Sequence, residues 1–266
     1  MQANKIVEKH EDRNRKCRLC LKKATLRNSH VIPEFFYKQM DLYDKIHRFN
    51  ILSTEHGKPF SIAQKGIREM LLCDQCEEKF SKWEGYARRV LYGGECIEIT
   101  TNEPKGIECK ISYVKFKLFQ LSILWRAGIS GHAAFSSVKL DNHESVLRKL
   151  LFEETPGTTE KYGCIILYST KHTDITSNMI HCMGMSNIDG IPCIRLMLGG
   201  CFWLFFLSET SSDLRHSGLF LQETGLLRIL KTDKNPGGYI ESLAREFYYA
   251  NPDRCDQLGK KNIHPV

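Results

Sequence analysis

Residues 71–76 read L-L-C-D-Q-C, and they repeat the two-residue cysteine spacing of C-R-L-C at residues 17–20. Two residues between thiolates allow both sulfurs to reach one tetrahedral ion at about 2.3 Å. The second pair opens a segment with apolar and aromatic residues at helical spacing, at positions 80, 83, 86, 87, 90 and 91, which ends at Gly93-Gly94. We therefore expect a structural zinc ion at the start of a helix, bound by Cys17, Cys20, Cys73 and Cys76.

The interval between the two cysteine pairs is long for a zinc ribbon, and its pattern accounts for the extra length. A short helix is expected from Pro33, with apolar residues at 35, 36, 40, 43 and 46. Residues 47–64 alternate on both sides of E-H-G-K, which predicts a hairpin. A cysteine knuckle, a hairpin and a helix that carries the last two ligands form a treble clef. The alternative is a metal-free pair of turns, but structural zinc contributes roughly 10 kcal/mol or more to the folding of a small domain.

Between the two pairs, residues 29–33 read S-H-V-I-P. With C-R-L-C before it and L-L-C-D-Q-C after it, residues 17–90 resemble the HNH, or ββα-metal, endonuclease family in its zinc-bearing form. The resemblance implies that His30 is the general base that activates water for attack on a phosphodiester. It also implies a catalytic divalent metal, Mg²⁺ or Mn²⁺, beside that histidine.

The sequence departs from the family pattern at the positions that bind this second metal. Ser29 stands where the family has Asp or His, and Arg68 and Glu69 stand where it has Asn. Glu77 follows the final cysteine in place of His or Asn, and its carboxylate could still hold the metal. Other groups of the same segment that could substitute are Glu34, His47, Asn50, Glu78 and Glu84. Alternatively, His30 is a structural residue that bonds a backbone carbonyl.

The net charge of +7 is concentrated in the N-terminal third of the chain. Residues 1–92 contain 19 Lys and Arg against 12 Asp and Glu, whereas the remaining residues contain 19 of each. A solvated basic face alone explains such a bias, but next to an HNH-like motif it favours DNA or RNA as partner. The side chains expected to contact phosphates flank the first cysteine pair: Arg15, Lys16, Arg18, Lys22, Lys23 and Arg27.

Beyond residue 107 the chain predicts a second, α+β unit. Helices are expected at 113–128 and 143–152, and a closing helix at 239–250. Short segments rich in β-formers predict an antiparallel sheet, with Gly199-Gly200 as a two-residue turn; they span 164–168, 179–185, 193–198, 201–207, 218–222 and 226–230. The expected fold is α+β, divided into a basic lead-in (1–16), an HNH-like zinc domain (17–94), a strand and connector (95–106), an α+β domain (107–252) and a polar tail (253–266).

These features lead to two functional hypotheses from different classes. The first is a nucleic-acid-binding HNH-like endonuclease, with a role in phage defence or mobile-element biology and a protein partner or target bound by the C-terminal domain. The second is a non-catalytic zinc module for binding or assembly. A weaker idea is a redox centre between Cys164 and Cys201. The first ten residues lack the apolar core of a signal peptide, and the longest apolar runs are interrupted by charges, so we expect a cytoplasmic protein with no membrane span and with reduced cysteines.

Overall fold

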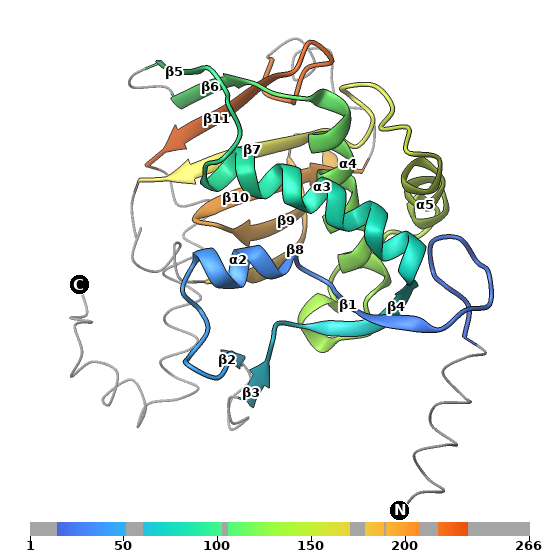
Figure 1. Ribbon diagram of the computed structural model, residues 1–266. Coiled ribbons are helices and arrows are strands. Elements are labelled where there is room, and N and C mark those ends of the chain that lie inside the picture. Colours follow the sequence, from blue (N-terminus) through green and yellow to red (C-terminus); the bar gives the residue numbers. More distant parts are fainter. Residues whose placement is uncertain are drawn as a thin grey trace, which may run out of the picture.

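The computed structural model describes residues 15–51, 61–102, 106–170, 179–188, 190–207 and 218–233. The predicted lead-in, apart from its last two residues, the closing helix at 239–250 and the polar tail lie outside these ranges. The described part is a mixed α+β fold with three sheets, as Figure 1 shows.

Residues 17–92, called the motif region below, consist of short elements around one long helix. Strand β1 (Leu26–His30) pairs antiparallel with β4 (Arg68–Cys73), and β4 runs directly into helix α3 (Asp74–Tyr92). Between them come helix α2 (Glu34–Gln39) and the antiparallel pair β2 (Arg48–Ile51) and β3 (Ser61–Gln64). The predicted hairpin and long helix are therefore confirmed, although the E-H-G-K turn lies outside the described residues.

Helix α2 is shorter than its apolar pattern. The chain leaves the helix after Gln39, and Asp41 adopts a left-handed φ of +50°. Tyr43 then stacks on Tyr37, with ring centroids 5.5 Å apart, so it packs beside the helix and does not continue it.

The rest of the described chain forms a seven-stranded sheet and two more helices. The strand order is β5-β6-β11-β7-β10-β9-β8, and every pair is antiparallel except β11 and β7, which are parallel. The strands span Ile99–Asn102 (β5), Gly106–Lys110 (β6), Cys164–Ser169 (β7), His181–Ile188 (β8), Ile191–Leu198 (β9), Cys201–Phe206 (β10) and Leu226–Thr232 (β11). The helices are α4 (Tyr113–Ile129), α5 (His143–Glu153) and the single 3-10 turn η1 (Ala133–Phe135).

Three details of the sheet bear on the predictions. Gly199 and Gly200, with φ of +61° and +74°, form the tight turn between β9 and β10, as predicted. Residues 95–106, predicted as a strand and connector, contribute β5 and the start of β6. The prediction of a strand at 218–222 is wrong. This segment is irregular, and Gln222 bonds Leu226 across a turn closed by Gly225 at φ +87°.

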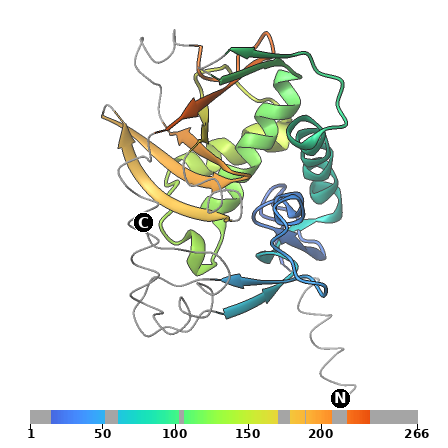
Figure 2. The ribbon, with the colours of Figure 1, turned by 90° about the vertical axis from the view of Figure 1, so that its left-hand side faces the viewer.

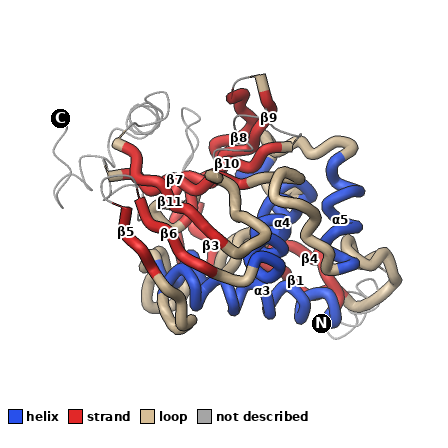
Figure 3. Tube along the Cα trace, turned by 90° about the horizontal axis from the view of Figure 1, so that it is seen from above, coloured by secondary structure: helices blue, strands red, loops and turns tan. Residues whose placement is uncertain are grey.

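Helix α4 lies at the centre of the molecule, between the large sheet and α3 (Figures 2 and 3). Thirteen of its residues are buried, among them Lys117 and Arg126, so the helix is covered by protein on nearly all sides. The main hydrophobic core is continuous, because it includes Leu72 and Trp83 of the motif region together with Trp125 of α4 and Trp203 of β10. This packing brings one face of α4 against β1 and α3, where the candidate site lies.

Candidate metal centre and the histidine beside it

The four cysteines of the two pairs converge, as predicted. The Sγ atoms of Cys17, Cys20, Cys73 and Cys76 all lie within 4.8 Å of one another. Cys73 ends β4 and Cys76 lies in the first turn of α3, so the direct junction of strand and helix sets one half of the cluster. The other half is a tight knuckle in which the Cys17 N–H bonds the Lys22 carbonyl and the Leu21 N–H bonds the Cys17 carbonyl, both at 2.9 Å.

The dimensions and the chemistry of this cluster suit a divalent metal ion. Four sulfurs arranged tetrahedrally at about 2.3 Å from zinc are about 3.8 Å apart, and Cys20 Sγ and Cys73 Sγ are 3.9 Å apart. Cys17, Cys73 and Cys76 are buried and Cys20 is half-buried. Burial raises the pKa of the Cys76 thiol, and the neighbouring sulfurs raise it further, so a thiolate there is unfavourable without a cation. A metal ion among the four sulfurs offsets the cost of the thiolate charge. The cluster can therefore hold a metal ion, for which zinc is the natural candidate.

His30 lies at the end of β1, opposite Arg68 of β4. Its Nε2 is 2.8 Å from the carbonyl oxygen of Lys65, and since a carbonyl only accepts, Nε2 carries the proton. Nδ1 is then the basic nitrogen. Burial lowers the pKa of His30, an effect that the Lys65 bond and Glu34 only partly oppose, so the imidazole is neutral near pH 7.

The backbone around this histidine is strained. Lys65, which accepts the His30 bond, has a φ of +62°, and His47, whose carbonyl accepts from the Lys65 N–H at 2.8 Å, has a φ of +60°. Gly66 follows with a φ of +77°, and a Cβ there would lie 3.0 Å from His30 Cδ2. Non-glycine residues in this conformation are uncommon and concentrate at functional sites.

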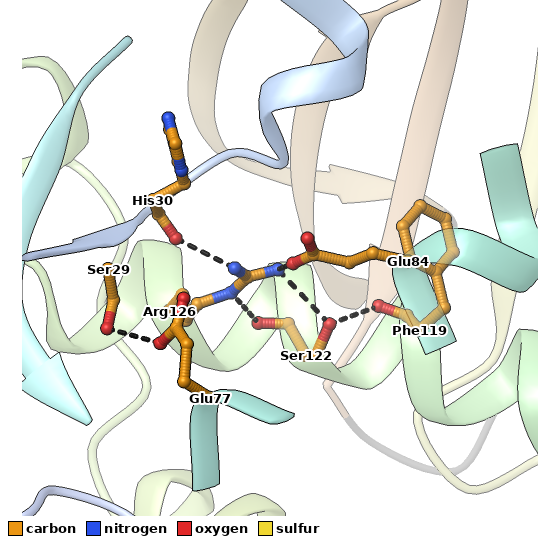
Figure 4. Close-up of polar contacts among 7 residues, drawn as sticks. All are labelled: Ser29, His30, Glu77, Glu84, Phe119, Ser122 and Arg126. Carbon is orange, nitrogen blue, oxygen red and sulfur yellow. Dashed lines mark hydrogen bonds and ion pairs between the residues drawn. The ribbon is translucent and has the colours of Figure 1, made fainter. Parts of the chain in front are cut away.

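Ser29 and Glu77, which stand at the family's second-metal positions, contact one another. Ser29 Oγ donates to Glu77 Oε2 at 2.6 Å, and Ser29 is fully buried. Figure 4 shows the His30 imidazole directed away from this pair, while the His30 carbonyl is directed at the Arg126 guanidinium. His30 and Glu77, the two residues predicted to be catalytic, therefore come from adjacent elements, but their side chains point to different sides of β1.

Arg126 of α4 fills the space beside Ser29 and Glu77 (Figure 4). Its Nη1 donates to the His30 carbonyl at 2.7 Å, and its Nη2 forms an ion pair with Glu84 Oε1 at 2.7 Å. Its Nε and Nη2 also bond Ser122, one turn earlier on α4. Only 1% of the Arg126 side chain is exposed. All three guanidinium nitrogens are thus bonded inside the protein, and the ring of Phe80 lies against the guanidinium carbon at 5.2 Å.

A catalytic Mg²⁺ or Mn²⁺ does not fit at this position. These ions need several oxygen ligands and retain water. Here the Glu77 carboxylate accepts a hydrogen bond from the buried Ser29 hydroxyl, and the fixed positive charge of Arg126 occupies the adjoining space. Three of the substitute carboxylates named above are in ion pairs: Glu34 with Lys38, Glu78 with Lys82, and Glu84 with Arg126.

Five of the six predicted phosphate-contacting residues, all except Arg15, separate into two groups. All six are exposed. Arg18 pairs with Glu144 of α5, and Arg27 pairs with Asp74 of α3. Lys16, Lys22 and Lys23, in contrast, form no ion pair with any described residue, so their charge faces solvent.

The cysteines of the large sheet do not suit the idea of a redox centre. Burial raises the pKa of each of these thiols, namely Cys164, Cys182, Cys193 and Cys201. Thiols with a raised pKa carry little thiolate, and the thiolate is the reactive form.

Arg126, the residue that organises this region, was missed by the sequence analysis. The helix at 113–128 was predicted as mostly buried, and a charged residue in such a helix indicates a buried ion pair. The sequence does not identify the partner, because Glu84 and Arg126 lie 42 positions apart and meet only when α3 packs on α4.

Comparison with known proteins adds no assignment: no family model, no curated protein and no solved structure matches this chain. Among the described residues, no helix combines the length and apolarity needed to cross a membrane.

Proposed function

We propose that this chain is a zinc-stabilised nucleic-acid-binding protein with an HNH-like, treble-clef arrangement of residues 17–92. The observation that carries the proposal is the set of three exposed lysines, Lys16, Lys22 and Lys23, that flank the first cysteine pair of the four-cysteine cluster and form no ion pair with a described residue. Phosphate groups are the ligands that such a cluster of cations attracts most strongly. Zinc fixes the geometry of the knuckle that presents them.

In this proposal the divalent-metal position of the HNH-like frame has a structural role. Ser29, Glu77 and Arg126 join β1, α3 and α4 there, and the arrangement leaves no site for Mg²⁺. The chain then binds nucleic acid without cutting it, and the large sheet is available for a protein partner.

A second candidate function is hydrolysis of the bound strand, and the state of His30 favours it. A neutral imidazole with Nε2–H held by Lys65 leaves Nδ1 as a proton acceptor, which is what a general base requires. In that reaction Nδ1 takes a proton from water as the water oxygen bonds to phosphorus, the bond to the leaving sugar oxygen breaks, and that oxygen takes up a proton from solvent. Arg68, opposite His30 on β4 and without an ion pair to a described residue, would offset charge on the phosphate.

One experiment separates these functions. Zinc-loaded protein is titrated into labelled duplex DNA, single-stranded DNA and RNA at fixed ionic strength, and the same substrates are then incubated with Mg²⁺, Mn²⁺ or EDTA. We expect a stable complex and intact substrate under all three conditions. No binding to any of the three nucleic acids overturns the proposal.

The variant His30→Asn, with His143→Asn as the control, decides the second candidate. His143 is a half-buried histidine of α5 whose ring bonds Tyr162. Cleavage by the wild type and by His143→Asn, but not by a folded, zinc-bound His30→Asn, establishes hydrolysis with His30 as base.

A further inference from the structure

Leu21 is held in a conformation that does not suit a leucine. It directly follows the second cysteine of the knuckle and has a φ of +61°. A bulky side chain makes this left-handed backbone unfavourable, whereas glycine adopts it at no steric cost. The left-handed φ of Leu21 turns the chain back so that the Lys22 carbonyl accepts from the Cys17 N–H, while the Leu21 N–H bonds the Cys17 carbonyl, and the two bonds close the knuckle.

Core packing does not explain the leucine. Leu21 is 51% exposed, so about half of this apolar residue faces water at the turn that directly follows Cys20. A strained backbone and an exposed apolar group are both unfavourable for the isolated protein, and their combination at one residue points to a contact outside it.

The charges around Leu21 indicate the chemistry of that contact. Lys16 and Lys23 are partners in an antiparallel bridge, which places two like charges directly opposite one another. Lys22 lies next to Leu21 in the chain. None of the three lysines is paired with a described carboxylate, although Arg18 at the same knuckle is.

Neutralisation of the metal centre is a simpler explanation for the lysines alone. Zinc bound by four thiolates carries a net charge of about −2, and nearby cations reduce the cost of holding it. That explanation does not account for an exposed leucine in a glycine conformation.

We propose that Leu21 and the three lysines form a nucleic-acid contact in which the lysines bind phosphates and Leu21 packs against the sugar or base between them. Apolar side chains flanked by cations act in this way in proteins that insert a wedge between bases. The inference rests on the nucleic-acid binding proposed above and identifies the surface responsible.

The decisive variant is Leu21→Gly, because it separates stability from binding. Removal of the strain leaves the melting temperature and zinc content equal to or above those of the wild type, while the affinity for nucleic acid falls several-fold. Ile99→Thr, which alters an apolar residue 60% exposed on β5, is the control and binds like the wild type.

The lysines are tested through the salt dependence of binding to duplex DNA. Removal of one lysine–phosphate interaction makes the negative slope of log K against log salt shallower by about 0.9. The variant Lys16→Gln/Lys23→Gln removes two such interactions and makes the slope shallower by about 1.8. The control is Lys110→Gln/Lys139→Gln, two exposed lysines elsewhere in the described chain, which leaves the slope unchanged.

The outcomes distinguish the inference from the function on which it rests. If the wild type binds nucleic acid and the Leu21 and lysine variants bind equally well, this surface is wrong and the proposed function stands. If the wild type binds no nucleic acid, both fail. If Leu21→Gly loses affinity only for vesicles that contain anionic lipid, the contact is with a membrane surface and the inference is overturned.

Discussion

Arg126 Nη1 donates a hydrogen bond to the main-chain oxygen of His30, at 2.7 Å and across 96 residues of sequence. The same guanidinium holds Glu84 of α3. One buried side chain of α4 therefore fixes both the end of β1, where the candidate histidine lies, and the helix that carries Cys76. Glu69 of β4 reinforces this junction by accepting from Ser130 and the following N–H groups after α4 ends.

The ion pair between the buried Arg126 and the largely buried Glu84 should be costly to break. We expect Arg126→Met to lower the free energy of unfolding by about 3–5 kcal/mol, because Glu84 is left with an uncompensated buried charge. The deficit should shrink at acid pH, where the Glu84 carboxyl, whose pKa is raised by burial, takes up a proton.

Denaturant unfolding of Arg126→Met, Glu84→Gln and the double variant measures this coupling. The double variant should lose less stability than the sum of the losses measured for the two single variants. Lys82→Met, which breaks an exposed pair with Glu78, is the control and should change stability by less than about 1 kcal/mol. Additive effects of Arg126→Met and Glu84→Gln would contradict the role given to this pair.

Metal removal should unfold the motif region. We expect one zinc ion per chain, and we expect its removal by a chelator, or the substitution Cys73→Ser, to abolish the cooperative unfolding transition, since zinc contributes roughly 10 kcal/mol or more in such sites. Zinc content and circular dichroism provide the measurement. Cys96→Ser, a change at an exposed cysteine, should retain both zinc and fold. A zinc-free chain with the same melting temperature would exclude a structural metal.

His30 should make the protein less stable below pH 6.5. Its folded-state pKa is lowered from 6.5, chiefly by burial, so the unfolded chain binds more protons in the window below 6.5. The contribution of His30 to the free energy of unfolding therefore rises with pH through this window and is constant above pH 6.5. The titration of the His30 ring, followed by NMR, should show a midpoint below that of a histidine in an unfolded peptide, and His30→Asn should flatten the stability profile there.

Lys117 should also make the protein more stable as the pH rises, in this case at alkaline pH. It is fully buried on α4, donates to the carbonyls of Thr159 and Tyr162, and burial lowers its pKa to about 8. The folded state loses this proton near pH 8 and the unfolded chain near 10.5, so the Lys117 contribution to stability increases between them.

Unfolding of Lys117→Met at pH 7.5 and 9.5, compared with the wild type, isolates this contribution. The wild type should gain stability relative to Lys117→Met at the higher pH. Lys115→Met, at an exposed lysine on the same helix, should follow the wild type. A parallel pH response of Lys117→Met and the wild type would show that the Lys117 ammonium does not titrate in this range.

The sequence alone determined the local parts of this protein. Two identical cysteine spacings, the helix that starts at the second cysteine pair and the turn at Gly199-Gly200 all depend on residues close in the chain, and each prediction is confirmed. The parallel pairing of β11 with β7 was missed because a contact between distant residues decides it. The irregular course of residues 218–222 and the early end of α2 were missed as well, although the turn at Gly225 and the stacking of Tyr43 on Tyr37 involve residues close in the chain.

Only the tertiary structure decided the character of the candidate site. The positions of Ser29, His30 and Glu77 were evident in the sequence, but their environment comes from α4, which packs against β1 and α3 and inserts Arg126 beside them. The physical reason is that burial and ion pairing depend on which elements meet in space, and residues 42 or 96 positions apart carry no local pattern that reveals their contact.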